Sequence, residues 1–141
     1  MARRFALPFL LLALLSGCGA APFVTATPSF ARFRADDVMR GFKAAGLRAD
    51  GPQSLAPGAL GADAPRYAEA KSFAVGQPGS ATAATLFTFD SAADLTAMET
   101  FLRQKYAKKS RMVVHRNVLL VFSVTGTEET GMYDPVLLAL R

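Results

Sequence analysis

Residues 82–107 read TAATLFTFDSAADLTAMETFLRQKYA and contain two different periodicities in succession. Residues 82–89 are rich in Thr and Phe, which favour an extended strand. Ser91 then begins a pattern similar to a capping box, with Asp94 in place of the usual Glu. Apolar side chains follow at helical spacing as far as Tyr106. The segment therefore predicts a strand followed directly by an amphipathic helix that ends near residue 107.

Further strands are predicted on both sides of this segment. Residues 70–75 favour a strand, and Gly76-Gln77-Pro78-Gly79 favours a turn, so an antiparallel hairpin should lead into residues 82–89. Residues 111–114 and 118–124 predict a second hairpin around His115-Arg116-Asn117. The last of these strands is apolar on both faces, so we expect it inside the sheet.

A helix is predicted near each end of this region. Residues 36–45 combine an acidic start with an apolar stripe, and Gly46 with Leu47 fits a Schellman end in which Leu47 folds back on Phe42. Asp134 and Pro135 fit the N-cap and first position of a short helix through residue 140. Residues 48–66 carry repeated Gly and Pro without an amphipathic period, which indicates a long irregular loop.

The predicted order is α-β-β-α-β-β-α. It indicates an α+β fold with a four-stranded antiparallel sheet and helices packed mainly on one face. A circularly permuted ferredoxin-like sandwich has this order, although element order alone does not determine which strands are neighbours.

Composition excludes several classes of protein. The chain has 141 residues, is 51% hydrophobic and 19% charged, and carries a formal net charge of +5. This balance is typical of a folded domain and is too mild to identify an anionic partner. One Cys and one His exclude a disulfide framework and any multi-Cys or multi-His metal site built from one chain.

The N-terminus has the layout of a secretory signal. A positive start, Met1-Ala2-Arg3-Arg4, precedes an apolar segment over residues 5–15 and then small residues. That segment would span only about 16 Å as a helix, whereas a bilayer core is roughly 30 Å thick. A permanent transmembrane anchor is therefore the weaker interpretation.

The end of this signal, Leu15-Ser16-Gly17-Cys18, resembles the lipobox of bacterial lipoproteins. The resemblance implies removal of residues 1–17 and a diacylglyceryl cysteine at Cys18, carrying fatty-acyl chains of the palmitate type. Two or three acyl chains suffice for stable membrane anchoring. The alternative is an ordinary secretory signal in which Cys18 stands by chance.

The same resemblance predicts a protein of the cell envelope that is anchored to a membrane on the extracytoplasmic side. Gly19, where Asp would imply inner-membrane retention, favours the outer membrane in a source with two membranes. In a source with one membrane, the protein would lie on the outer leaflet of that membrane. Residues 18–34 are then the lipidated Cys and a flexible tether, and residues 35–141 form a single α+β domain.

Three segments of this domain also resemble small uncharacterised bacterial envelope lipoproteins. They are DVMRGFKAAGL at 37–47, FTFDSAADL at 87–95 and NVLLV at 117–121. These motifs are structural in type, so the resemblance implies a fold and no catalytic residue.

Basic residues gather between positions 103 and 116 without one acidic residue among them. They are Arg103, Lys105, Lys108, Lys109, Arg111 and Arg116. Such a cluster could contact lipid phosphates or an anionic envelope polymer. The alternative is a solvated helix end, where cations offset the helix dipole. Nucleic acid is not expected as a partner, because Tyr106 is the only aromatic residue inside the cluster and the compartment is wrong.

Catalytic patterns are absent from the sequence. It contains no nucleophile elbow, phosphate-binding loop, dinucleotide fingerprint or metalloprotease motif. His115 and the adjacent carboxylates Asp36/Asp37 and Glu128/Glu129 do not form a convergent set by spacing. We therefore expect no catalytic residue, cofactor or metal, and a non-catalytic contact with another envelope component. The alternatives are a small-ligand binder that uses the sheet face or residues 48–66, and a small enzyme.

Overall fold

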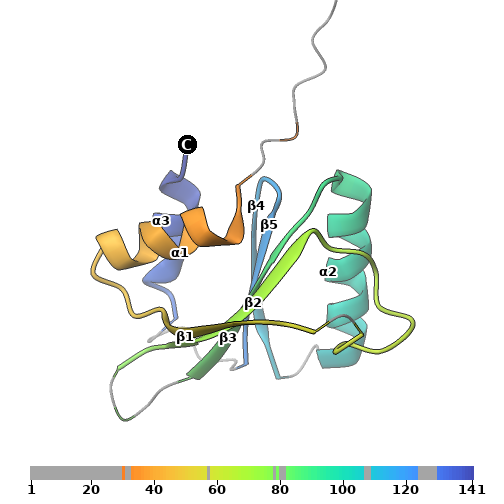
Figure 1. The fold of residues 1–141 in the computed structure, drawn as a ribbon, viewed down its shortest axis with the longest axis horizontal. Helices are drawn as coiled ribbons and strands as arrows, with labels where there is room; N and C mark the ends of the chain where they lie inside the picture. Colours follow the sequence, from red (N-terminus) through yellow and green to blue (C-terminus); the bar gives the residue numbers. More distant parts are fainter. Residues whose placement is uncertain are drawn as a thin grey trace, which may run out of the picture.

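A five-stranded antiparallel sheet with the strand order β1-β2-β3-β5-β4 organises the structure (Figure 1). The structure is a computed structural model that describes residues 30, 33–56, 58–77, 79, 82–106, 109–123 and 130–141. The elements in chain order are α1 (Ala35–Ala44), β1 (Asp50–Ser54), β2 (Glu69–Val75), β3 (Thr82–Thr88), α2 (Ala92–Tyr106), β4 (Arg111–His115), β5 (Val118–Phe122) and α3 (Tyr133–Ala139). The α+β class is as predicted.

The prediction of four strands is wrong, because β1 lies within the segment expected to be an irregular loop. All five residues of β1 are exposed, so the strand has no alternation of apolar and polar residues that periodicity could detect. It forms by pairing with β2, with Asp50 opposite Ala74 and Ser54 opposite Lys71. The register shifts between Asp50 and Gln53, where Gly51 adopts a positive φ of 56°. Tertiary pairing therefore creates this strand.

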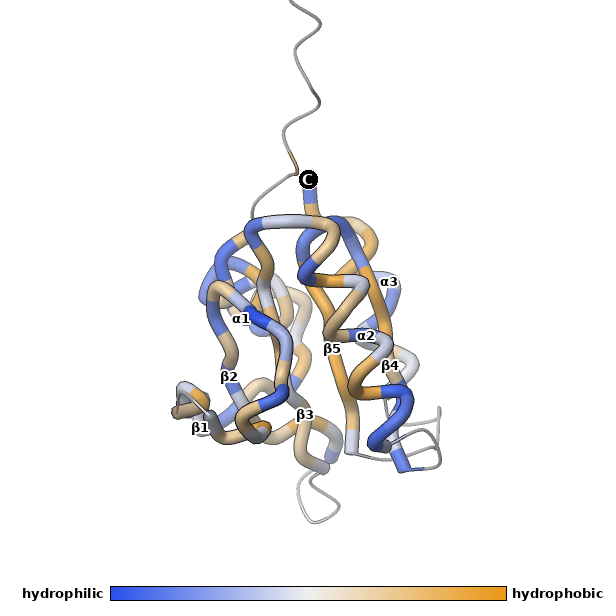
Figure 2. Tube along the Cα trace, turned by 90° about the vertical axis from the view of Figure 1, so that its right-hand side faces the viewer, coloured by the Kyte–Doolittle hydropathy of each residue, from blue (hydrophilic) through white to orange (hydrophobic). Residues whose placement is uncertain are grey.

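The prediction that the helices pack mainly on one face holds for α1 and α3 but not for α2. Helices α1 and α3 lie on one face of the sheet and α2 lies on the other, as Figure 1 shows. The reason is that the inner strands are apolar on both sides. Along β5, Leu120 packs in the cluster with α1 and α3, whereas Leu119 packs in the cluster with α2. Figure 2 shows β5 as a hydrophobic strand, and the expectation that it lies inside the sheet is confirmed.

Strand β5 lies between β3 and β4, which are joined in the chain by α2. Thr85 of β3 faces Val121 of β5, and Met112 of β4 faces Val121 from the other side. The helix therefore crosses over one strand, as in a split β-α-β unit. This crossover places the C-terminal end of α2 over β3 and β5, on the face of the sheet opposite to α1 and α3.

Local signals at two helix ends are confirmed. The Asp94 N–H donates to Ser91 Oγ (3.1 Å), and the Ser91 hydroxyl donates to the Asp94 carboxylate (2.7 Å). At the end of α1, the Leu47 N–H donates to Phe42 O (2.9 Å) and Gly46 has a φ of 76°, as a Schellman end requires.

The start of α3 differs from the prediction. The helix begins at Tyr133, so Asp134 is inside the first turn and is not the N-cap. Its carboxylate instead pairs with Arg111 of β4. A tertiary ion pair has replaced the predicted local cap.

Asn117 fixes the point where the chain enters the domain. Its side chain is buried, its Oδ1 accepts from the Phe33 N–H (2.8 Å), and its Nδ2 donates to Phe33 O (3.0 Å). Chain entry therefore lies beside the β4–β5 turn, at the opposite end of the domain from the C-terminal end of α2 (Figure 1).

Candidate functional site

A cavity of about 420 Å³ lies between the C-terminal end of α2, the sheet and the turn at Leu60. Its floor contains Thr85 and Phe87 of β3, with Val121 of β5 and the adjacent Ser123. Leu102 and Tyr106 of α2 form the opposite wall. We call this space the α2 cavity.

The two faces of the sheet differ in burial. Because successive strand residues point to opposite faces, Ser72, Ala74, Ala83 and Thr85 share the α2-facing side with Ala70 and Phe87. On the other side the same strands carry large buried residues: Phe73, Val75 and Leu86. Of the four small residues on the α2-facing side, Thr85 lines the α2 cavity.

A polar contact ties the loop beside the α2 cavity to the helix. The Lys105 ammonium donates to the backbone oxygen of Leu60 (3.0 Å). The same ammonium lies 5.3 Å from the centre of the Phe101 ring, a cation–π distance. This arrangement holds Leu60 against the mouth of the cavity.

The lining of the α2 cavity mixes apolar side chains with hydroxyl groups and carries one sign of charge. Among its lining residues Lys109 is the only ionisable group with a charge at neutral pH, and no lining residue is acidic. The Ser110 hydroxyl and the Lys109 N–H both donate to Tyr106 O (3.2 and 2.8 Å), so the last carbonyl of α2 is satisfied. The cavity can accept an apolar group with an anionic end near Lys109.

The structure divides the predicted basic cluster among several places. Arg103 pairs with Glu99 one helical turn away (2.6 Å), and Arg111 pairs with Asp134 while its guanidinium lies over the Phe122 ring. Arg116 lies in the β4–β5 turn with its guanidinium 5.4 Å from the centre of the Phe33 ring.

Lys105 and Lys109 are the members that the structure brings together, at the exposed end of α2 beside the cavity. Lys108 lies outside the residues that the structure describes, as do Leu15, Ser16, Gly17 and Cys18.

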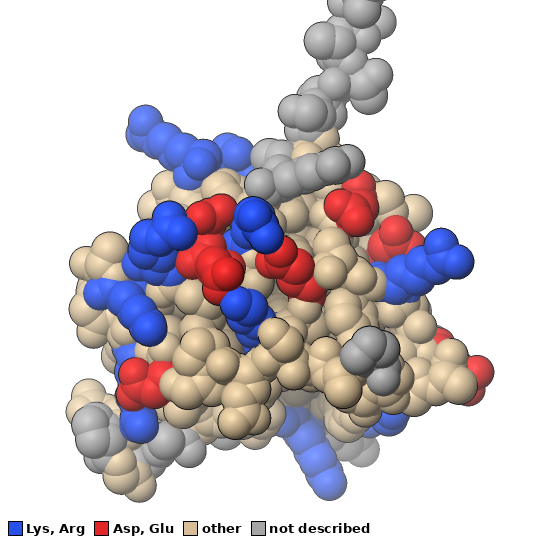
Figure 3. Space-filling model, in the orientation of Figure 1, with Lys and Arg blue, Asp and Glu red and all other residues tan. Residues whose placement is uncertain are grey.

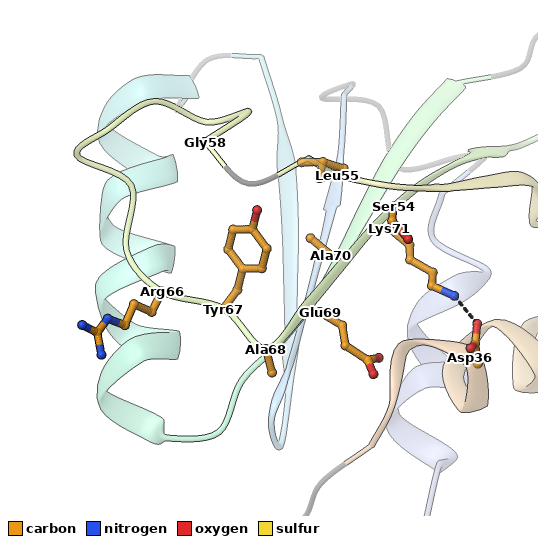
Figure 4. A pocket seen from close by; sticks show the side chains of 10 residues that line it. All are labelled: Asp36, Ser54, Leu55, Gly58, Arg66, Tyr67, Ala68, Glu69, Ala70 and Lys71. Atoms are coloured by element: carbon orange, nitrogen blue, oxygen red, sulfur yellow. Dashed lines mark hydrogen bonds and ion pairs between the residues drawn. The ribbon is translucent and has the colours of Figure 1, made fainter.

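A second cavity, of about 640 Å³, lies between the end of β1, the start of β2 and the start of α1 (Figure 4). Lys71 reaches from β2 to Asp36 of α1, and the ion pair between them lowers the pKa of Asp36 through the hydrogen bond from the Lys71 ammonium. Glu69 Oε2 accepts from the Ala35 N–H (2.7 Å), which caps α1 from outside the helix. These charges serve to attach α1 to the sheet. Figure 3 shows acidic and basic side chains intermixed over α1.

The remaining candidates from the sequence do not converge on one point. His115 Nε2 lies 3.3 Å from Leu140 O, and its ring stacks on Phe33. Asp37 pairs with Arg40 (3.2 Å), whereas residues 128–129 are outside the described part of the chain. Within the described ranges, no group of three or more His, Cys, Asp or Glu side chains could hold a metal ion.

Two polar residues with long-range roles were missed by the sequence analysis. The Tyr133 hydroxyl donates to Arg48 O (2.6 Å) and accepts from the Gly76 N–H (3.2 Å). Glu69 caps a helix distant in sequence. Neither residue stands in a local pattern, so the sequence carries no signal for these contacts.

Comparison with protein-family profiles, with curated proteins and with solved structures finds no match to this chain. Among the described residues, no helix is both long and apolar enough to cross a membrane.

Proposed function

We propose that the protein is a lipid-anchored extracytoplasmic lipoprotein whose domain makes a non-catalytic contact with an anionic component of the cell envelope. One observation carries the anchor: the sole cysteine of the chain is Cys18, directly after Leu15-Ser16-Gly17 and an apolar segment. A lipobox requires its cysteine at this position, and acylation there would tether the domain to a membrane.

The placement of Lys105 and Lys109 supports the contact. Both side chains are exposed at the end of α2, and Figure 1 places this end opposite the entry of the chain near Phe33. A tether attached before Phe33 therefore leaves this end accessible to a partner. Ammonium groups near an anionic surface contribute ~1 kcal/mol each.

Mass spectrometry of the protein extracted from its native membrane tests the anchor. We expect the mass of residues 18–141 plus two or three acyl chains in the wild type and no acylated species in Cys18→Ser. Cleavage elsewhere with an unmodified Cys18 would overturn the anchor.

Sedimentation of the full-length protein with envelope fragments tests the contact. The double variant Lys105→Gln/Lys109→Gln should bind about thirtyfold more weakly at low salt, and high salt should weaken wild-type binding to a similar level. The matched control is Lys43→Gln/Arg141→Gln, which removes the same charge from exposed residues elsewhere. Equal loss in both double variants would show a general charge effect and would overturn the proposed surface.

A further inference from the structure

We propose that the α2 cavity is a binding site for a small amphipathic monoanion, a molecule with an apolar body and one carboxylate, such as a medium-chain carboxylic acid. This site shares Lys109 with the proposed envelope contact but goes beyond that contact, because it depends on the space beneath α2 and would exist in a domain with or without an anchor.

The first step concerns the size and lining of the α2 cavity, which suit a small molecule. The volume of about 420 Å³ falls within the ~300–1,000 Å³ of small-molecule sites. Phe87 and Leu102 are 2% exposed and close the inner wall, whereas Leu60, Val121 and Tyr106 keep apolar surface that water reaches. The apolar part of a ligand would replace water against Leu60, Val121 and Tyr106.

The asymmetry of the sheet carries the second step. Thr85 of β3 and Val121 of β5 are paired directly, line the cavity and are only partly buried. On the other side of the sheet, Leu86 and Leu120 of the same strands are fully buried. A ligand over Thr85 and Val121 would cover the part of the α2-facing side that the helix leaves open.

The third step concerns the charge of the lining, which indicates that the ligand is an anion. Lys109 is the only lining residue charged at neutral pH, and Lys105 is held nearby by its bond to Leu60 O. The negative end of the α2 dipole opposes an anion here. However, Tyr106 O already accepts two hydrogen bonds, which offset part of the negative charge at this helix end. A bound carboxylate would therefore pair with the Lys109 ammonium at the rim. The hydroxyls of Thr85 and Ser123 are further polar groups of the lining.

Photo-crosslinking with peptide mapping distinguishes ligand bound at the site from ligand dissolved in the membrane. The full-length protein in phosphatidylcholine vesicles is labelled with a decanoic acid analogue that carries a diazirine at the chain end, and the labelled peptides are located by mass spectrometry. We expect labels on residues 85–87, 102–106 and 121–123. At equal free aqueous concentrations, decanoate should compete strongly and decanol weakly, because decanol lacks the anion.

Two variants test the charge of Lys109 and the space inside the cavity independently. Lys109→Gln should lower site labelling about fivefold, the loss expected for an exposed ion pair, whereas Lys43→Gln on α1 should leave it unchanged. Ser123→Phe places a ring in the cavity from an exposed position of its floor and should abolish labelling while the unfolding temperature stays within a few degrees of wild type.

The opposite results would overturn the proposal. Labels spread over the whole surface, or site labelling that survives Ser123→Phe, would show that the cavity is not the binding site. Equal competition by decanol and decanoate, together with full labelling of Lys109→Gln, would show that the carboxylate is not recognised. Because Ser123→Phe changes no charge, its effect is distinguishable from failure of the lysine contact with the envelope.

Discussion

Tyr133 connects three segments that are far apart in the sequence. It is fully buried, its ring meets Phe42 edge to face at 5.2 Å between centroids, and its hydroxyl bonds to Arg48 O and the Gly76 N–H. Tyr133→Phe keeps the ring and leaves both backbone groups without this partner. We expect a loss of about 1–3 kcal/mol in the free energy of unfolding, measured by urea denaturation. The matched control is Tyr106→Phe, at a residue that is 38% exposed, and an equal effect there would contradict the role of the buried hydroxyl.

The ion pair of Asp36 with Lys71 makes stability depend on pH in the acid range. The hydrogen bond and charge of Lys71 lower the pKa of Asp36 below 3.8 in the folded protein. The folded protein therefore binds this proton less readily than the unfolded chain, so the stabilisation is present above pH 3.8 and is lost as pH falls through the lowered pKa. Urea denaturation across this range should show a shallower acid loss in Asp36→Asn than in the control Asp63→Asn. Identical pH profiles would show that the pair contributes nothing.

At the scale of the element, α2 depends on its N-cap. The Asp94 N–H, one of the donors left unpaired at a helix start, bonds to Ser91 Oγ. Ser91→Ala should lower the free energy of unfolding by about 0.5–2 kcal/mol, since alanine offers no acceptor. Thermal denaturation followed by circular dichroism measures the effect. Thr100→Ala, at an exposed position inside the same helix, serves as the control; a loss of stability there equal to that in Ser91→Ala would argue against a capping role.

At the scale of the whole molecule, Arg111 and Asp134 join α3 to the edge strand β4. The side chains are 18% and 29% exposed, so the pair is only partly screened. Within the described residues, Arg111 Nη1 and Asp134 Oδ1 are buried and lack hydrogen-bond partners, so part of the desolvation cost is uncompensated. We expect Arg111→Met and Asp134→Leu each to destabilise by about 1–3 kcal/mol, and the double variant to recover most of that loss. A double-mutant cycle in urea measures the coupling, and strictly additive losses would refute it.

Prediction from the sequence succeeded where a short segment contains its own signal. The Schellman end at Gly46 and the Ser91 cap involve neighbours within a few residues, and both are present. It failed for β1, whose exposed residues have no periodicity, and for the start of α3, where Asp134 bonds to Arg111. The sequence offered the basic cluster as a possible surface for anionic contact or as a solvated helix end. Strand β4 carries Arg111 into an ion pair and leads to Arg116 at the opposite end from Lys105.

The chain's own residues thus define the positions of most helices and strands, the lipobox resemblance at Cys18 and the sign of the charge at the end of α2. These features depend on residues close together in the chain, so they can be predicted from local residue spacing. Tertiary structure alone decides that the sheet has a fifth strand, that α2 lies opposite α1 and α3, and that Leu60 and Lys109 line one cavity. These contacts join distant segments, and they arise because inner strands apolar on both faces must be covered on both sides.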